Sequence, residues 1–236
     1  MKKIIYKAGD RGHVDHGWLN AYHSFSFASY YDPLRVHFGL LRVLNDDTVA
    51  SGMGFGMHPH DNMEIVTIPT KGMLEHKDNM GNSSVIKPGE VQIMSAGTGV
   101  MHSEFNPSKT EEVKLFQIWV FPKEKNIKPR YDQRMFDVKE RKNKFQTVVS
   151  PEKSAHSLWV NQDVYFSLGN FDKNFSTQYS VKHKGNGAYI MVVEGNVEIE
   201  GEQLNRRDAI GISEVNDFKI SAMSDTELLV IDVPMS

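Results

Sequence analysis

Two short motifs, His58-Pro-His60 and His102-Ser-Glu104, hold the residues of this sequence that are best suited to bind a metal. Each motif has one residue between its two members. Successive side chains of a β-strand point to opposite faces, so residues i and i+2 share a face, with Cα atoms about 7 Å apart. Two such strands facing each other would direct three imidazoles and one carboxylate at one point. This donor set suits a divalent transition metal.

The segments that would position these motifs are short, apolar and rich in β-branched residues. They are separated by turn-forming sequences such as Asp78-Asn-Met-Gly81 and Pro88-Gly-Glu90. This pattern predicts an all-β sandwich or barrel. Residues 113–121 are mainly apolar at both odd and even positions, which point to opposite faces of a strand. This pattern predicts a central strand that is covered on both faces. The predicted strands lie at residues 40–44, 63–68, 91–94, 113–121, 189–193, 197–199, 209–212, 218–220 and 228–233.

Internal similarity predicts two copies of one β unit. Thr70-Lys-Gly-Met-Leu-Glu75 resembles Val193-Glu-Gly-Asn-Val-Glu198, and each segment follows an apolar run and turns at a glycine. The second copy lacks the chemistry of the first, because its two histidines, His156 and His183, belong to no His-x-His or His-x-Glu pair. We therefore expect a metal-binding domain at residues 1–130 and a related domain without metal ligands at residues 131–236.

Composition and charge exclude several classes of protein. The chain has 236 residues, of which 39% are hydrophobic, and this suffices for a sizeable core. The net charge of -3 provides no basic field for nucleic acid. The absence of cysteine excludes disulfides, thiolate metal sites and cysteine nucleophiles. Because neither a secretory signal nor an apolar run of membrane-spanning length is found, we expect a cytoplasmic monomer that binds no membrane.

The segment from Phe121 to Lys144 differs from the rest in its high density of charged residues and its two prolines, Pro122 and Pro129. A solvated connection between two domains is one interpretation. A patch that binds phosphate or nucleic acid is the other. Acidic residues are interleaved with the basic ones throughout, so we favour the connection.

Glycines around the two motifs complete a larger pattern. Residues 52–64 read Gly-Met-Gly-Phe-Gly-Met-His-Pro-His-Asp-Asn-Met-Glu, and residues 89–106 place three glycines before the second motif and an asparagine after it. These stretches resemble the two sequence motifs of the cupin superfamily. Seven residues separate Glu64 from Gly72 where the motif has six, and Ser95 stands where a proline is usual. Both departures are consistent with a local bulge or a different turn.

Within the cupins, the chain is similar to the pirin family, especially to bacterial pirin-like proteins, over nearly its whole length. The resemblance implies a bicupin of two stacked double-stranded β-helix barrels, which are jelly-roll-like. It also implies a metal in the N-terminal barrel, bound by the residues that match His58, His60, His102 and Glu104. Family members have been associated with quercetin 2,3-dioxygenase (quercetinase) activity, and eukaryotic ones with binding to transcriptional regulators. The stretches that carry the resemblance are Arg11-Gly-His-Val-Asp-His-Gly-Trp18, His23-Ser-Phe-Ser-Phe27, His58-Pro-His60, Met94-Ser-Ala-Gly-Thr-Gly99, His102-Ser-Glu-Phe-Asn106 and Gln117-Ile-Trp119.

Two glutamates are candidates for the fourth ligand. The alternation of side chains along a strand does not distinguish them, because each shares a face with histidines of its own motif. The general cupin pattern uses the glutamate of the first motif, here Glu64, whereas pirins use the one beside the last histidine, here Glu104. The family resemblance favours Glu104 and leaves Glu64 as a neighbour of the ligands. Phe55, Met94 and Gln117 are further candidates for residues that line the pocket or support the ligands.

The remaining histidines of the N-terminal half are expected to have structural roles. His13 and His16 are three residues apart, and we favour hydrogen-bonded loop histidines over a second metal site. His76 follows a glycine turn and is expected to be exposed there. His23 and His37 have no partner at a useful spacing.

Three histidines and one carboxylate would leave two positions of an octahedral metal open, for a phenolic substrate and for O2. We expect an oxidoreductase with Fe(II), or with Zn, Ni, Mn, Cu or Co as alternatives. Its reaction would be dioxygenase cleavage of a quercetin- or flavonol-like ring, with Glu104 as the catalytic residue that takes the hydroxyl proton. Two alternatives remain open. The protein could be a metal- or redox-responsive regulator that binds a protein partner, or another cupin metalloenzyme such as an isomerase.

Overall fold

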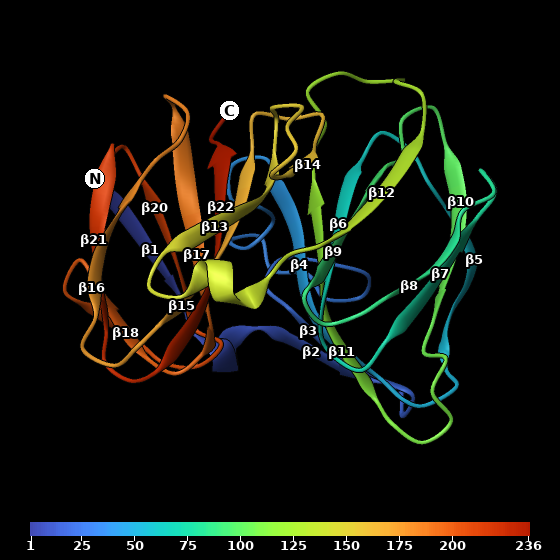
Figure 1. The fold of residues 1–236 in the computed structure, drawn as a ribbon, viewed down its shortest axis with the longest axis horizontal. Helices are drawn as coiled ribbons and strands as arrows, with labels where there is room; N and C mark the ends of the chain where they lie inside the picture. Colours follow the sequence, from blue (N-terminus) through green and yellow to red (C-terminus); the bar gives the residue numbers. More distant parts are fainter.

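The structure, a computed structural model that describes residues 1–236, consists of two β-barrels side by side (Figure 1). Of its 24 elements, 22 are strands and two are 3-10 turns, η1 (Ala8–Asp10) and η2 (Val138–Arg141). No helix is long and apolar enough to cross a membrane. The all-β bicupin architecture that the sequence predicts is confirmed.

The first barrel has one sheet of seven strands and one of four. The seven-stranded sheet has the order β12 (Arg130–Met135), β9 (Glu90–Ser95), β6 (Glu64–Lys71), β11 (Val113–Val120), β4 (Leu41–Val49), β3 (Leu19–His23) and β2 (Gly12–Asp15). The four-stranded sheet has the order β5 (Gly54–His60), β10 (Val100–Phe105), β7 (Leu74–Asp78) and β8 (Ser83–Ile86).

The second barrel repeats this arrangement of seven strands and four. Its seven-stranded sheet has the order β1 (Lys2–Tyr6), β20 (Ala209–Ser213), β17 (Asn186–Glu194), β22 (Thr226–Pro234), β15 (Tyr165–Phe171), β13 (Phe145–Ser150) and β14 (Leu158–Trp159). Its four-stranded sheet has the order β16 (Ser176–Ser180), β21 (Asp217–Ala222), β18 (Val197–Ile199) and β19 (Glu202–Leu204).

Gly72 and Gly195 occupy equivalent turns in the two barrels. Each lies between two strands of its unit and has a positive φ, +71° and +82°. A Cβ at either position would collide with a backbone carbonyl, that of Glu112 or that of Asp225. A register shift also occurs at the same place in the strand pairs β6–β11 and β17–β22. The internal sequence similarity therefore reflects a structural repeat.

Two strands are exchanged between the barrels. The N-terminal strand β1 pairs with β20 at the edge of the second barrel, and β12 pairs with β9 at the equivalent edge of the first (Figure 1). A division of the chain at residue 130 does not describe this exchange. The charged segment 121–144 is also more than a solvated connection, because β12 is a strand of the sheet and Arg130 donates to the carbonyl of Trp159 at 2.7 Å.

The largest core lies between the barrels, where the two seven-stranded sheets pack face to face. It is a cluster of 27 buried residues that includes Phe116 and Ile118 of β11 and Leu229 and Ile231 of β22. Strand β11 is central and buried on both faces, as predicted from its apolar pattern. A separate cluster of 15 residues fills the second barrel. The corresponding cluster of the first barrel has only 7 residues, so this barrel keeps room for a cavity.

Candidate metal centre

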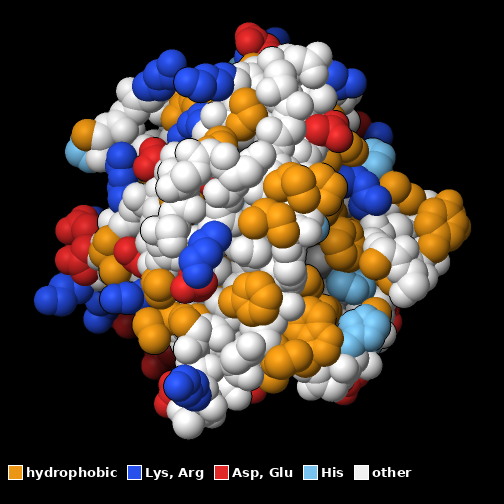
Figure 2. Space-filling view, turned by 90° about the vertical axis from the view of Figure 1, so that its right-hand side faces the viewer, with side chains coloured by type: hydrophobic (Ala, Val, Ile, Leu, Met, Phe, Trp, Pro, Cys, Tyr) orange, Lys and Arg blue, Asp and Glu red, His pale blue; other side chains and the backbone are white.

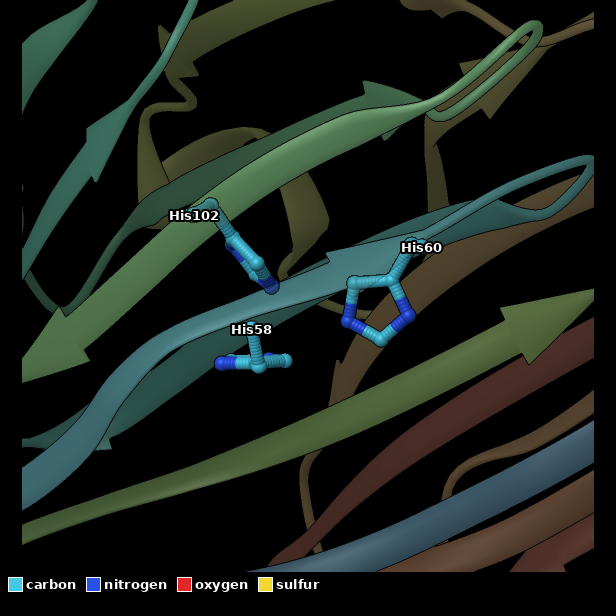
Figure 3. A group of neighbouring side chains, drawn as sticks. All are labelled: His58, His60 and His102. Carbon is cyan, nitrogen blue, oxygen red and sulfur yellow. The ribbon is translucent and has the colours of Figure 1, made fainter.

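His58, His60 and His102 meet inside the first barrel, where their imidazoles point toward one another (Figure 3). His58 and His60 lie on β5, and His102 lies on the neighbouring antiparallel strand β10, directly opposite His58. The ring centroids are 4.4 to 4.9 Å apart. The ligand nitrogens lie within 4.8 Å of one another, which is close enough for one metal ion.

The protonation of these imidazoles suits metal binding. His58 Nδ1 donates to the carbonyl of Gly56 at 2.7 Å, which leaves Nε2 available to a metal. Burial, with the neighbouring His58, lowers the pKa of His60 to about 4. Burial and the adjacent imidazoles lower the pKa of His102 to about 2. Both rings are therefore neutral near pH 7, the form in which histidine binds metals.

His102 is held by a buried chain of two further residues on β7. Its Nδ1 lies 3.4 Å from Nδ1 of His76, and Nε2 of His76 lies 3.2 Å from a carboxylate oxygen of Asp78. Burial raises the pKa of Asp78, but hydrogen bonds from Asn82, His76 and Met80 outweigh it, so that the pKa stays below its usual value. The ionised carboxylate accepts the Nε2 proton of His76.

The chain of contacts determines which nitrogen of His102 carries its proton. Once Nε2 of the neutral His76 is protonated, its Nδ1 can only accept, so Nδ1 of His102 must donate. Nε2 of His102 then keeps its lone pair. This atom is buried and has no hydrogen-bond partner in the protein. A buried nitrogen lone pair without a hydrogen-bond partner, next to two other imidazoles, is what a metal ligand requires.

The position of His76 corrects the prediction that this residue is exposed in a turn. Its side chain is fully buried. The error arose because the glycine turn ends at Gly72, and β7 begins two residues later. The sequence held a signal that was missed. His76 and Asp78 form a third pair with one residue between its members, and β7 pairs with β10.

Glu104 lies beside these residues in a second group, with His76 and His102, whose ligand atoms are also within 4.8 Å of one another. Gln117 donates its side-chain amide to both carboxylate oxygens of Glu104, at 3.1 and 2.9 Å. Thr67 in turn donates to the Gln117 carbonyl oxygen at 3.0 Å. Burial raises the pKa of Glu104 to about 7, although the hydrogen bond from Gln117 opposes this shift.

Glu64 and Met94, which the sequence placed among the candidates, lie elsewhere. Glu64 belongs to neither group of ligand-type residues. Its carboxylate accepts from the hydroxyl of Ser95 at 2.8 Å and from the backbone of Asn161 at 3.2 Å, and so links the two barrels. The serine that replaces the usual proline is thus a hydrogen-bond donor. Met94 is fully buried in a small apolar cluster with Ile65 and is not part of the cavity wall.

The other histidines are distributed as single residues. His13 lies on β2 and stacks on Tyr22, with ring centroids 4.5 Å apart. His37 contacts the carbonyl of Gly39 at 2.8 Å. His23 does have a partner, contrary to expectation: it is buried, and its Nδ1 lies 2.8 Å from the side-chain oxygen of Asn45. The sequence spacing could not show this contact, because it joins two strands.

A cavity of about 460 Å³ opens beside the histidines. Aromatic side chains line much of it, and histidines lie among hydrophobic side chains on this face of the molecule (Figure 2). Phe55 and Gln117 are part of the wall, whereas the contributions of Trp18 and Asp47 were not anticipated. The lining residues are Trp18, Leu19, Ala21, His23, Phe27, Asn45, Asp47, Gly54, Phe55, Gly56, His58, His60, Glu104, Gln117 and Trp119.

The second barrel has apolar residues at the positions of the site. Equivalent turns and strand pairings align the two units residue by residue. The residues at the positions of His58, His76, His102, Glu104 and Gln117 are Tyr179, Ile199, Phe218, Ile220 and Val230. All five belong to the core that fills the second barrel. Side chains of the types that bind metals, with a cavity beside them, therefore occur only in the first barrel.

Comparison with known proteins agrees with this arrangement. Residues 6–120 match the family model described as Pirin, and residues 147–233 match the Quercetinase C-terminal cupin domain. The chain is 46% identical over 233 residues to a protein of Escherichia coli K12 named quercetin 2,3-dioxygenase, which covers 98% of this chain and 99% of that protein. The chain belongs to the pirin family. A pirin-like protein of Caulobacter vibrioides is 40% identical over 94% of this chain and 95% of its own length.

A solved pirin structure has the same fold. It is the bacterial pirin YhhW of Escherichia coli in complex with nickel(II), with a TM-score of 0.94, 43% identity and complete coverage of both chains. The pirin fold and family membership expected from the sequence are thus confirmed. In the present chain, neutral imidazoles, an orphaned Nε2 and a buried carboxylate provide donors that could hold one divalent metal.

Proposed function

We propose that this pirin is a metal-dependent dioxygenase that opens a ring of a flavonol-like substrate with O2. The observation that carries the proposal is the convergence of His58, His60 and His102 beside a cavity with aromatic walls. Two relatives that match 98% of the chain are named quercetin 2,3-dioxygenase, which supports the same reaction class.

His58, His60, His102 and Glu104 would hold a single divalent transition metal, for which iron(II) is our first choice. A redox-active metal bound there would supply the electron transfer that lets a phenolic substrate react with O2. Both oxygen atoms enter the product, and the electrons come from the carbon atoms of the substrate ring. The reaction therefore needs no separate reductant.

The residues of the chain would bind, orient and deprotonate the substrate. The aromatic walls, including Trp18, Phe27, Phe55 and Trp119, favour a flat ring system. Glu104 would accept the proton of the substrate hydroxyl on a carboxylate oxygen. Gln117 holds that carboxylate through both of its oxygens and so fixes its orientation.

Oxygen uptake by the metal-loaded protein tests this function. The protein would be purified without O2, loaded with iron(II) or nickel(II), and mixed with quercetin in an oxygen electrode cell. We expect about one O2 consumed per flavonol, and a loss of at least about 100-fold in turnover for Glu104→Gln, since a positioned base typically contributes 10²- to 10⁴-fold.

Glu64→Gln is the matched control, because Glu64 is equally buried but lies outside both groups of ligand-type residues. It should leave the turnover within about twofold of wild type, as expected for a residue that touches neither metal nor substrate. Absence of O2 uptake with quercetin and with related phenols, at stoichiometric metal content, would refute the proposal.

A further inference from the structure

His23 and Asn45 are two polar residues of the cavity wall that the proposed chemistry does not use. His23 lies on β3, and Asn45 lies directly opposite it on β4. Both side chains line the cavity, and only 4% and 3% of the two residues are exposed. His23 belongs to neither group of ligand-type residues. Polar side chains at such buried positions normally serve a partner, so the pair calls for an explanation.

The contact between the two side chains determines the protonation of His23. Its Nδ1 lies 2.8 Å from Oδ1 of Asn45. An amide oxygen only accepts, so Nδ1 of His23 donates to it. Burial lowers the pKa of His23, with His13 adding to this shift and the hydrogen bond to Asn45 opposing it. The ring is therefore neutral near pH 7, and its Nε2 keeps a lone pair.

One further atom of each side chain remains free for a ligand. Nε2 of His23 and Nδ2 of Asn45 have no hydrogen-bond partner in the protein, yet both retain accessible surface, unlike Nε1 of Trp119 in the same wall. Because the two residues are otherwise buried on the inner face of the sheet, the open space that these atoms face is the cavity. The wall therefore presents one acceptor and one donor side by side.

The pair lies next to the residue that holds Glu104. Asn45 is paired with His23 on one side and with Gln117 of β11 on the other. Neighbouring strands are about 4.8 Å apart, so the pair lies roughly 5 to 10 Å from Gln117 across the sheet. Gln117 donates to both carboxylate oxygens of Glu104. A ring with one oxygen at this carboxylate can thus place a second substituent at the pair.

A neutral hydroxyl group fits this pair better than other oxygen substituents do. Its proton can be donated to Nε2 of His23 while its oxygen accepts from Nδ2 of Asn45. A methyl ether has no proton to donate and would leave Nε2 without a partner. A carboxylate or a sulfate would direct lone pairs at Nε2 and would find no positive charge in the pair to offset its own desolvation.

We propose that His23 and Asn45 are specificity residues that bind one free hydroxyl of the substrate, distinct from the hydroxyl that Glu104 deprotonates. This assignment rests on the proposed function and adds a selection among substituents. At the position that meets the pair, a free hydroxyl is favoured over hydrogen, over a methyl ether and over an anionic conjugate.

Equilibrium binding without O2 tests the assignment separately from turnover. Calorimetric titrations of the nickel(II)-loaded protein would use 3-hydroxyflavone as the reference, because its only hydroxyl is the one beside the carbonyl. The other ligands add one hydroxyl, or one methoxyl in its place, to the pendant or to the fused ring. For wild type we expect one added hydroxyl to tighten binding by about tenfold, the scale of one buried hydrogen bond, and the matching methoxyl to give no gain.

Two variants should each abolish this gain. His23→Phe keeps a ring beside Phe27 but loses the acceptor, and Asn45→Leu loses the donor. Both should bind 3-hydroxyflavone within about twofold of wild type, the margin for groups that do not interact. Damage to the wall would instead weaken all ligands alike. His13→Phe is the control, because His13 is exposed and stacks on Tyr22 outside the cavity, and this variant should keep the full gain.

The assignment is overturned if no added hydroxyl tightens binding to wild type, if the methoxyl ligands bind as well as the hydroxyl ones, or if no ligand binds. It is also overturned if either variant keeps the gain. Should one variant fail to fold, the other variant and the methoxyl series in wild type still decide. A gain that the variants lose, without any O2 uptake, would count against the dioxygenase function alone and would support the hydroxyl contact.

Discussion

Nδ1 of His76 lies 3.4 Å from Nδ1 of His102, and this contact connects the candidate metal centre to Asp78, a carboxylate outside both groups of ligand-type residues. On the far side of His76, Nε2 lies 3.2 Å from Asp78. The order of donors and acceptors along this chain leaves Nε2 of His102 unprotonated and directed at the other histidines. A carboxylate and an imidazole thus prepare a third residue for metal binding before any metal arrives.

Removing His76 should weaken metal binding without removing a ligand of the proposed set. We expect His76→Leu to lower the affinity for nickel(II) by about 10- to 100-fold, the usual effect of losing a partner behind a metal ligand. Competition with a coloured chelator measures the affinity. His183→Leu is the control, because this exposed histidine lies in the second barrel and should change nothing. Unchanged affinity in His76→Leu would show that His102 needs no such support.

The metal-free protein should lose stability as the pH rises from 6.5 to 8. The folded-state pKa of Asp47 is raised to about 8, and those of Glu64 and Glu104 to about 7, mainly by burial. Their unfolded values are lower, so the folded state binds more protons in this range and the stability falls with rising pH.

A pH series of urea denaturation tests this dependence. Histidines with lowered pKa values oppose the trend only at the lower end of this window, because the unfolded rings, with a pKa of about 6.5, lose most of their remaining protons just above that pH. Asp47→Asn removes one titrating group, and we expect it to reduce the loss by about 1.5 kcal/mol between pH 6.5 and 8. An equally steep loss in the variant would mean that Asp47 titrates normally.

Gln117 should stabilise the fold through Glu104. Gln117→Leu removes both donors to a buried carboxylate, and we expect it to lower the free energy of unfolding of the metal-free protein by about 1–3 kcal/mol. Thr67→Val leaves those donors in place and removes one hydroxyl contact, so the loss should be smaller, about 1 kcal/mol. Equal losses from the two variants would show that the contact with Glu104 contributes little.

The two repeated glycine turns should tolerate alanine worse than an isolated turn does. Gly72→Ala and Gly195→Ala both force a positive φ on alanine and a clash with a backbone carbonyl. Gly81 has a φ of +95° but open space around it, which makes Gly81→Ala the control for φ alone. We expect the first two to lower the melting temperature more than the third, whose cost should be near 1 kcal/mol, about that of placing alanine in the left-handed region. Equal losses would remove the steric part of the explanation.

Local pattern was sufficient for much of the metal centre. A spacing of two residues on a strand brings His58 and His60 to one face, whatever the rest of the chain does, and the same holds for His102 and Glu104. Apolar residues at both odd and even positions likewise predicted β11 as a central strand, because burial of both faces explains such a sequence.

Contacts between strands could not be predicted in this way. His76 is buried because β7 pairs with β10 in a register that places His76 opposite Glu104, and this register depends on residues outside β7. Asp47 lines a cavity that remains open because the first barrel has a smaller apolar core than the second. The sequence of the Asn45-Asp-Asp47 segment contains no information about the size of the two cores, so the cavity could not be predicted from it.

By itself the sequence determined the β architecture, the repeat, the family and the pairs of ligand-type residues, since each depends on neighbours a few positions apart or on motifs read in order. Only the tertiary structure decided that β1 and β12 are exchanged between the barrels, that Glu64 links the barrels, and that Asp47 and Trp119 line the cavity. The reason is physical. Side-chain direction follows from the backbone of one strand, whereas convergence follows from the pairing of strands that lie far apart in the chain.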